Sequence, residues 1–388
     1  MSKRTLQLAA IALVILVAGG LRLYAAQRLD VDYDEPVYLS AAIEYAQAMR
    51  SGDLKMLAWS EHTYEHPALQ KILYGAVLLT QPVITRLPDN DLPRLAPIAS
   101  TEASRWNITA RHLAVFWGTL AVLVLAVLSP LAGLFLAVST LGIKYTSEVY
   151  LEALPLLTAL LCALAYRHWY AAVRGASRTG WRSLSWLMLS AVFLGITAAG
   201  KYVHAIVGVA ILIFWGWAIL RKQLPAASLA LMAGWGGLSL LAFVLFDPYL
   251  WPHPVARLAQ SLRFHQTFQD SRLVLMYSYP LWQPLRWLAA FSSYYELRPA
   301  SAFLINLDTF IFVAAILGLP RLLKQDPLFF CWLVTGLLFL LLWTTKWPQY
   351  TLILLAPFSL AAAHGVLTVW QLARAARRAR WPGRTPRT

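Results

Sequence analysis

Four carboxylates lie within six residues of this 388-residue sequence: Asp30, Asp32, Asp34 and Glu35. Asp34 and Glu35 directly precede Pro36, and proline suits the first turn of a helix. The residues that follow, VYLSAAIEYAQAMRSG, have helical spacing and end in a Ser-Gly stop. The two acids can therefore cap a helix and meet its dipole. The alternative is a general base held where a substrate arrives.

A second acidic pair lies in KYTSEVYLEALPLL. Glu148 and Glu152 are four residues apart, so on a helix they share one face. Glu152 is flanked by Leu151 and Leu154, and an ionisable residue inside a membrane span is costly and usually faces a partner or a cavity. The competing interpretation is an acid that is paired or that reaches the membrane surface.

Three isolated cations stand at the ends of apolar runs: Arg111, Lys201 and Lys346. Each can anchor its helix at a membrane interface. Together they can instead hold a phosphate, the anion that Lys and Arg bind most readily. Carboxylates and phosphate-binding cations on one side of a membrane indicate transfer chemistry on a lipid phosphate.

A Glu65-His66-Pro67 segment is a further candidate, but two adjacent ligands are a weak metal signal because structural sites usually need four. A partner such as His265 would be required. No Gly-rich phosphate loop, G-x-S-x-G, H-E-x-x-H or CxxC occurs. Other candidates for the same site are His66, Glu148 and Asp247.

The composition shows which elements must position these residues. The chain is 59% hydrophobic and 13% charged, with 17 Trp, 17 Tyr and 16 Phe. Apolar windows near the roughly 20 residues needed to cross a bilayer account for most of it. We therefore expect an all-α polytopic membrane protein. Both cysteines, Cys162 and Cys331, fall in apolar windows, which argues against a disulfide framework.

The net charge of +15 is better explained by basic cytoplasmic loops than by nucleic acid, which we do not expect as a partner. The clearest basic segments are 167–182, 221–222, 321–324 and the tail from Arg374. The positive-inside rule places these and both termini in the cytoplasm. Ten spans satisfy it: 5–26, 112–129, 131–147, 150–167, 184–200, 202–220, 227–246, 302–320, 327–345 and 351–372.

The first window lacks a cleavage pattern and is too long for a signal peptide, so we expect a retained span. Residues 69–84 are apolar, but a crossing there would put the most basic loop outside. We expect an interfacial helix, with a short true span as the alternative. The expected organisation is one membrane domain with two long outer loops and a basic tail: 1–372, 27–111, 247–301 and 373–388.

Six segments in this order resemble the GT-C superfamily of membrane glycosyltransferases, in particular the branch of protein O-mannosyltransferases and lipid A aminoarabinose transferases. They are DYDEPVYL, YEHPALQKIL, ARHLAVFWGTLAVLVL, YLEALPLLTALL, GITAAGKYVHA and TKWPQYTLILLAPFSLAAAHG. The resemblance implies a GT-C fold of about 10–12 transmembrane helices. It also implies an inverting transfer of a sugar from a polyprenyl-phosphate carrier to an acceptor on the outer, extracytoplasmic face of the cell membrane.

The resemblance also implies roles for residues of this chain. Asp34 resembles the catalytic base, Glu35 its supporting neighbour and Glu152 the second acid. Arg111, Lys201 and Lys346 match positions that hold the carrier phosphate. Glu65 and His265 resemble a pair that binds zinc in the aminoarabinose branch, so a divalent metal is the cofactor implied.

This chain departs from the family at several of these positions. His66 stands where that branch has Lys, Ala68 where the family often has a second Pro, and Glu152 where it usually has Asp. These departures leave metal use open, together with the sugar and the acceptor, which can be a protein, a lipid or a glycan. Two other functions remain as alternatives: a transporter or flippase of a lipid-linked substrate, and a non-catalytic polyprenol-binding subunit. A transporter would place its site near the bilayer midplane, whereas the ionisable residues here gather at one face.

Overall fold

The computed structural model of the chain describes residues 2–58, 64–81, 102–174, 180–294 and 303–380. Within these ranges the chain is built from helices and contains no strand. The all-α fold expected from the composition is confirmed.

The helices follow one another in chain order with short connections. Up to residue 200 they are α1 (Lys3–Arg28), α2 (Glu35–Ser51), η1 (Leu54–Ala58), α3 (Leu69–Leu78), α4 (Glu102–Leu128), α5 (Pro130–Val138), α6 (Thr140–Tyr145), α7 (Ala153–Val173) and α8 (Trp181–Gly200). Beyond it they are η2 (Tyr202–Ala205), α9 (Ile206–Leu220), α10 (Ser228–Phe246), η3 (Pro248–Leu250), α11 (Pro254–Phe268), α12 (Arg272–Tyr277), α13 (Gln283–Tyr294), α14 (Asp308–Gln325), α15 (Pro327–Leu342), η5 (Pro348–Leu354) and α16 (Leu355–Arg380).

Seven stretches of helix in the described ranges are long and apolar enough to cross a membrane. They coincide with seven of the ten expected spans, so the chain is a multi-pass membrane protein. The helical stretches are Lys3–Arg28, Arg105–Leu128, Ala153–Val173, Trp181–Gly200, Tyr202–Leu220, Ser228–Phe246 and Pro348–Arg377.

The other three expected spans differ from the helices found. The window 131–147 is divided between α5 and α6, each too short to cross alone. The window 302–320 becomes α14, which starts later and runs on to Gln325. The window 327–345 becomes α15, an apolar helix of 16 residues.

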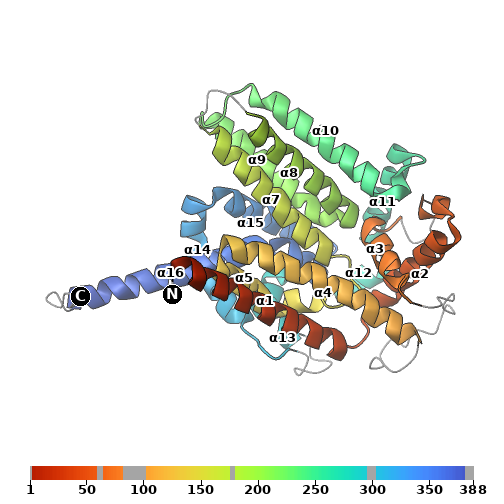
Figure 1. Ribbon diagram of the computed structural model, residues 1–388, viewed down its shortest axis with the longest axis horizontal. Coiled ribbons are helices and arrows are strands. Elements are labelled where there is room, and N and C mark those ends of the chain that lie inside the picture. The colour runs from red at the N-terminus through yellow and green to blue at the C-terminus, as the bar shows by residue number, and fades with distance from the viewer. Residues whose placement is uncertain (1, 59–63, 82–101, 175–179, 295–302, 381–388) are drawn as a thin grey trace.

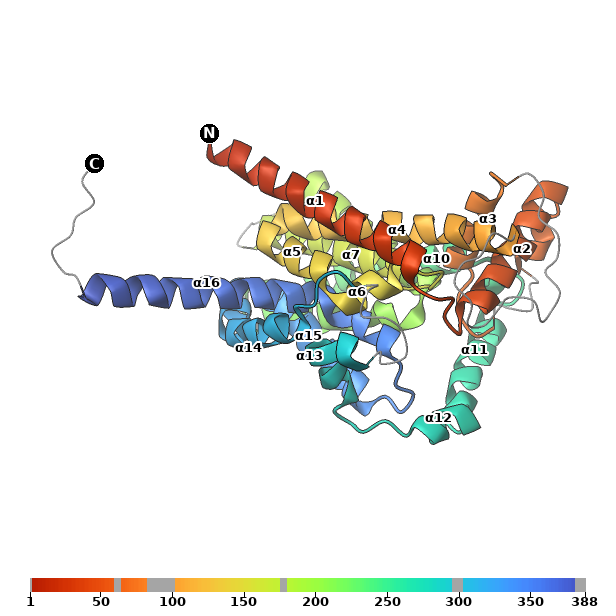
Figure 2. The ribbon, with the colours of Figure 1, turned by 90° about the horizontal axis from the view of Figure 1, so that it is seen from below.

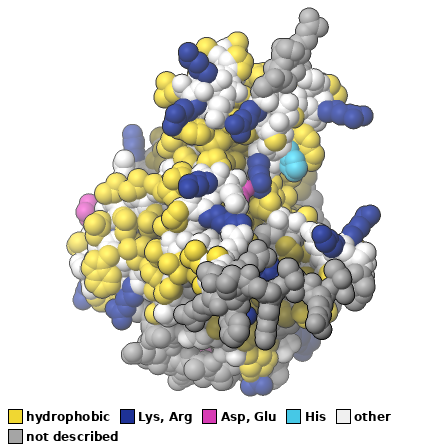
Figure 3. All heavy atoms as spheres, turned by 90° about the vertical axis from the view of Figure 1, so that its left-hand side faces the viewer, with side chains coloured by type: hydrophobic (Ala, Val, Ile, Leu, Met, Phe, Trp, Pro, Cys, Tyr) yellow, Lys and Arg dark blue, Asp and Glu magenta, His cyan; other side chains and the backbone are white. Residues whose placement is uncertain are grey.

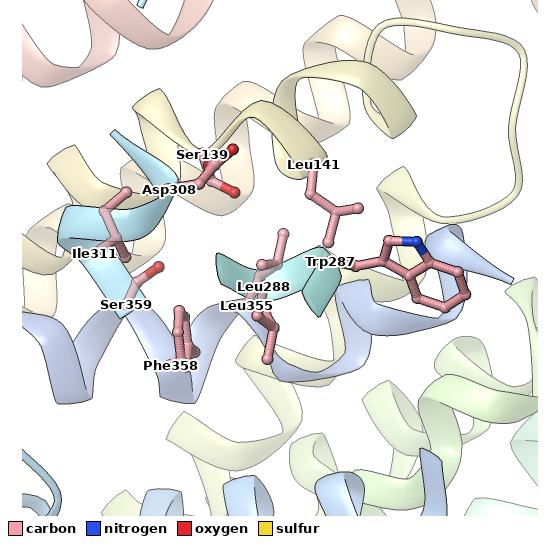
Figure 4. Close-up of a pocket in the computed structure, with 9 residues that line it drawn as sticks. All are labelled: Ser139, Leu141, Trp287, Leu288, Asp308, Ile311, Leu355, Phe358 and Ser359. Atoms are coloured by element: carbon pink, nitrogen blue, oxygen red, sulfur yellow. The ribbon is translucent and has the colours of Figure 1, made fainter. Parts of the chain in front are cut away.

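The break between α5 and α6 has a local cause at Ser139. Its backbone is extended, and its hydroxyl accepts from the Gly142 N–H at 3.4 Å, so one helix ends and another starts there. Asp308 adds a second acceptor, at 3.1 Å from the Thr140 N–H. Figure 4 shows Asp308 and Ser139 beside a cavity of about 10 Å³, which holds at most one water. This small cavity serves the packing of α6.

The helix α3 spans ten residues, which is about half of what a crossing needs. It packs closely on α2, because a Cβ at Gly75 would lie 2.7 Å from the Ala42 carbonyl oxygen. The interfacial helix expected at 69–84 is in this respect confirmed up to Gln81, and residues 82–84 lie outside the described ranges.

The helices of the two long loops gather at one end of the molecule. Figures 1 and 2 both show α2, α3 and α11 at the end opposite to the start of α1 and the tip of α16. We call it the loop end. Because the two terminal helices start and finish at the opposite end, both termini lie on one side, as the charge pattern predicts. The helical part of the expected tail, 373–380, continues α16, and 381–388 lie outside the described ranges.

The end that carries the termini is rich in basic side chains. Figure 3 views this end and shows many Lys and Arg side chains and very few Asp or Glu. This distribution agrees with the cytoplasmic side expected from the positive-inside rule. The membrane side itself and the division into a domain of residues 1–372 stay predictions.

Candidate functional site

The start of α2 places the acidic cluster at the loop end. Asp34 is the residue before the helix, Pro36 lies in its first turn, and the helix ends at Gly52, which has a φ of 73°. Glycine adopts this left-handed conformation without the cost that a side chain brings. The helix expected from the sequence, with its Ser-Gly stop, is therefore confirmed. Asp34 makes no capping hydrogen bond through its side chain.

Glu35 is fully buried and satisfied by several donors. Its Oε1 accepts from Arg111 Nε at 2.8 Å, from the Val149 N–H at 2.7 Å and from Asn107 at 3.4 Å. Its Oε2 accepts from the Asp32 N–H at 2.9 Å and from the same guanidinium. A carboxylate held in this way ties α2 to α4 and to the turn before α7, so its place is structural.

Arg111 has no N–H group left for a substrate. Besides Glu35, it donates Nη1 to the carbonyl oxygens of Ala26 and Leu29, both at 2.8 Å, and Nη2 to that of Asp30 at 2.9 Å. A guanidinium has five N–H donors, and all five are occupied here. The expectation that Arg111 holds a carrier phosphate is therefore not supported by the geometry. It satisfies instead the carbonyl groups that the C-terminus of α1 leaves open.

Lys144 is a charged residue of this region that the sequence analysis did not single out. It is fully buried in α6, and its Nζ donates to Glu148 at 2.9 Å and 2.7 Å and to Asp32. The signal available in the sequence is the spacing of Lys144 and Glu148 by four residues, one helical turn. It was hidden because these residues were assigned to a membrane span.

Glu152 and Lys201 form a buried ion pair between the start of α7 and the end of α8. The Nζ of Lys201 also lies 5.3 Å from the ring centroid of Tyr350, in η5. Only Oε1 of Glu152 is paired, and its Oε2 has no hydrogen-bond partner in the part of the chain that the structure describes. The site thus contains a buried acceptor that a bound hydroxyl group can use.

Asp34 differs from these paired acids. Among the described residues it forms no ion pair, and its carboxylate accepts one long hydrogen bond, from Gln349 at 3.4 Å. Burial raises its pKa to about 7, and the charges of Asp32 and Glu152 add to the rise, while Lys201 opposes it. A carboxyl group with this pKa exchanges its proton near neutral pH, as a general base must.

A cavity of about 420 Å³ opens beside Lys201. Its walls come from both long loops and from the ends of α8 and α15. They include His66, Lys201, His265, Gln269, Trp343 and Tyr350. The two loops that the sequence marks as long therefore meet at one cavity.

Lys346 lines a different cavity, of about 310 Å³, with Tyr277, Tyr279 and Trp347. The two cavities have Gln269 as a common wall. Of the three cations predicted to hold one phosphate, Lys201 faces the first cavity, Lys346 the second, and Arg111 faces neither.

The histidines of the first cavity stand close together. The ring centroids of His66 and His265 are 5.5 Å apart, and burial lowers the pKa of both imidazoles. Both rings are therefore neutral at pH 7. His66 cannot supply the positive charge that Lys brings at this position in the aminoarabinose branch, which leaves Lys201 as the cation of this cavity.

The predicted metal pair finds little support in the geometry. The described residues contain no group of three or more His, Cys, Asp or Glu side chains able to hold a metal ion. Glu65 contributes its backbone to a hydrogen bond with His265. The side chains present therefore do not fit the closed ligand set of a structural zinc site.

Asp247 supports the site from below. Its Oδ1 accepts from the Ala68 N–H at 3.1 Å, which caps the N-terminus of α3. Burial raises its pKa to about 6. The Nζ of Lys71 donates to the His66 carbonyl oxygen at 2.8 Å, and this contact fixes the turn that carries His66 into the cavity.

The fold, with this geometry, is that of GT-C membrane glycosyltransferases. The structure of ArnT from Cupriavidus metallidurans bound to undecaprenyl phosphate is similar at a TM-score of 0.56 and 14% identity, over 94% of this chain and 60% of ArnT. The oligosaccharyltransferase of Archaeoglobus fulgidus in the apo form is similar at a TM-score of 0.59 and 12% identity, over 97% and 52%.

A third similar structure is the oligosaccharyltransferase AglB from Archaeoglobus fulgidus with an inhibitory peptide and a dolichol-phosphate, at a TM-score of 0.57 and 13% identity. This chain spans 52–60% of the length of these three proteins. No protein-family model and no curated protein sequence matches it. The GT-C fold expected from the sequence is confirmed.

Proposed function

We propose that this protein is an inverting glycosyltransferase that moves a sugar from a polyprenyl-phosphate carrier to an acceptor hydroxyl on the extracytoplasmic face of the membrane. The observation that carries the proposal is the contrast between Asp34 and its neighbours: Asp32, Glu35 and Glu152 are held in ion pairs, whereas Asp34 is not. ArnT and AglB, whose structures contain undecaprenyl phosphate and dolichol-phosphate, add support for the lipid class of the donor.

Asp34 is the proposed general base. The acceptor oxygen attacks the anomeric carbon, its proton passes to the Asp34 carboxylate, and the bond from the anomeric carbon to the phosphate oxygen breaks. The carrier leaves as polyprenyl phosphate with both bonding electrons. Attack opposite to the leaving group inverts the anomeric centre. The pKa of Asp34, about 7, suits a base that is ionised at neutral pH and still takes up a proton.

Lys201 is the proposed partner of the carrier phosphate. Its ammonium has three N–H groups, of which Glu152 accepts one. The remaining donors can stabilise the negative charge that develops on the departing phosphate, in a site from which burial excludes water. The free Oε2 of Glu152 is placed to accept from a hydroxyl of the sugar.

No step of the proposal runs through a metal. Glu65, His66 and His265 do not form the ligand group that such a site requires among the described side chains. The acceptor is defined here only as a hydroxyl compound.

The test is transfer from a panel of radiolabelled polyprenyl-phosphate sugars, in membranes that contain the wild-type protein or Asp34→Asn at equal expression. Loss of a general base costs about 10²- to 10⁴-fold in rate. Transfer by the wild type that is reduced to this extent in the variant supports the proposal. Equal transfer by both proteins removes Asp34 from the mechanism, and no transfer with any donor and acceptor favours a transporter or a non-catalytic subunit.

A further inference from the structure

Lys144 contacts more negative charge than its own balance requires. Its Nζ donates to both oxygens of Glu148, at 2.9 Å and 2.7 Å, and this bidentate pair already compensates the buried ammonium. The aromatic rings of Tyr145 and Tyr150, with centroids at 4.7 Å and 5.7 Å, favour a cation at the same point. The additional contact with Asp32 therefore calls for another reason.

Asp32 belongs to the turn that carries Asp34. Its Oδ1 accepts from the Tyr33 N–H at 2.6 Å, and its own N–H donates to Glu35 Oε2 at 2.9 Å. The carboxylate and the backbone of Asp32 are thus fixed from two sides: by Lys144 in α6 and, through Glu35, by Arg111 in α4.

Asp34 has little of its own to hold it in place. Its one hydrogen bond within the described chain, to Gln349, is long at 3.4 Å. A catalytic group must stay within a fraction of an ångström of its working position, and a displacement of 1 Å can cost about 10²-fold in rate. The position of this carboxylate must therefore come from the residues on either side of it.

We propose that Lys144 is a positioning residue for Asp34, which it fixes indirectly by holding Asp32 and with it the turn from Asp32 to Glu35. Lys144 touches neither the cavity nor a substrate. The inference rests on the proposed function, because it matters for catalysis only if Asp34 is the base.

The experiment removes the contact with Asp32 while keeping the buried charges balanced. In Glu148→Gln, Lys144 keeps one carboxylate partner, Asp32. In the double variant Lys144→Met/Glu148→Gln, one positive and one negative charge are gone together and Asp32 is released. The comparison between these two proteins isolates the contact between Lys144 and Asp32, and Lys144→Arg in the Glu148→Gln background tests rescue by a second cation.

Three measurements are made on the full chain in lipid nanodiscs: steady-state transfer, binding of a short-chain polyprenyl phosphate, and amide hydrogen exchange. Relative to Glu148→Gln, the double variant is expected to lose roughly 10²-fold in kcat, while the KM for the donor and carrier binding change by less than about threefold. Exchange is expected to accelerate in the peptide covering residues 29–40 and to stay unchanged in α8 and α10. The Arg variant is expected to regain part of kcat.

A merely structural role of Lys144 predicts a different result: faster exchange throughout the protein and equal losses in binding and in kcat. That result, or equal kcat and equal exchange at residues 29–40, would overturn the proposal. If the wild type transfers no sugar, the proposed function fails. The exchange measurement then still decides whether Lys144 holds the turn.

Discussion

The guanidinium of Arg111 and the carboxylate of Glu35 form a buried ion pair in which every N–H group of the arginine is occupied. Two donors go to Glu35 and three to carbonyl oxygens at the end of α1 and just beyond it. The pair joins α1, α2 and α4 beneath the cavity. An arginine that sequence alone assigns to a phosphate thus holds the floor of the site.

Arg111→Met is therefore expected to destabilise the protein rather than to weaken the carrier alone. Removing one partner of a buried pair typically costs about 3–5 kcal/mol, because the other charge stays buried and unpaired. Thermal unfolding in detergent should show a markedly lower midpoint, with partial recovery in Glu35→Gln/Arg111→Met. An unchanged midpoint combined with lost carrier binding would return Arg111 to the phosphate site.

Lys201 is expected to dominate the affinity for the carrier phosphate. Hydrogen bonds to charged groups contribute about 1.5–3 kcal/mol, so Lys201→Met should weaken binding of a short-chain polyprenyl phosphate roughly 10- to 100-fold. The variant is made together with Glu152→Gln, so that no buried acid is left unpaired. Lys324→Met, an exposed cation at the opposite end of the molecule, is the control. Equal affinity in both would move the phosphate to Lys346 and the second cavity.

Gly75 should be indispensable for the packing of α3 on α2. A methyl group there would lie 2.7 Å from the Ala42 carbonyl oxygen, so the two helices must separate. Overpacking of this kind costs about 1–3 kcal/mol, and displacement of α3 moves His66 as well. Gly75→Ala is expected to lower both the melting temperature and transfer.

The matched control for Gly75→Ala is Gly234→Ala, in α10, where a Cβ meets nothing within 4 Å. This substitution should be neutral or slightly stabilising, because Ala favours the helix. Equal behaviour of the two variants would show that α2 and α3 do not depend on close contact.

The sequence predicted the membrane fold well because hydrophobic length is a strong, local signal. Seven expected spans, the helix that starts at Glu35 and its stop at Gly52 are all present. The divided span at Ser139 was missed, because an apolar run reads the same whether one helix or two short ones form it. Its cause is the carboxylate of Asp308, which lies 168 positions away along the chain.

Charged residues were predicted less completely, since a sequence shows that a charge is present but not what it contacts. Asp34, Glu152 and Lys201 do come together at the loop end. Arg111 and Lys346 do not join them in one phosphate site, and Lys144 was overlooked inside an assumed span. Pairing between distant segments decides these roles, and residue type and spacing along the chain do not encode it.

The central claim, that Asp34 is the general base, is tested most directly by the pH dependence of sugar transfer in wild type and Asp34→Asn. Because the pKa of Asp34 is raised to about 7, its basic form is present above that pH and is lost below it. The wild-type rate should rise with pH, roughly tenfold per unit well below pH 7, and level off above it. In Asp34→Asn, transfer should be about 10²- to 10⁴-fold slower and should lack this limb. A wild-type rate that does not change between pH 5.5 and 8.5, or the same limb in the variant, would contradict the account.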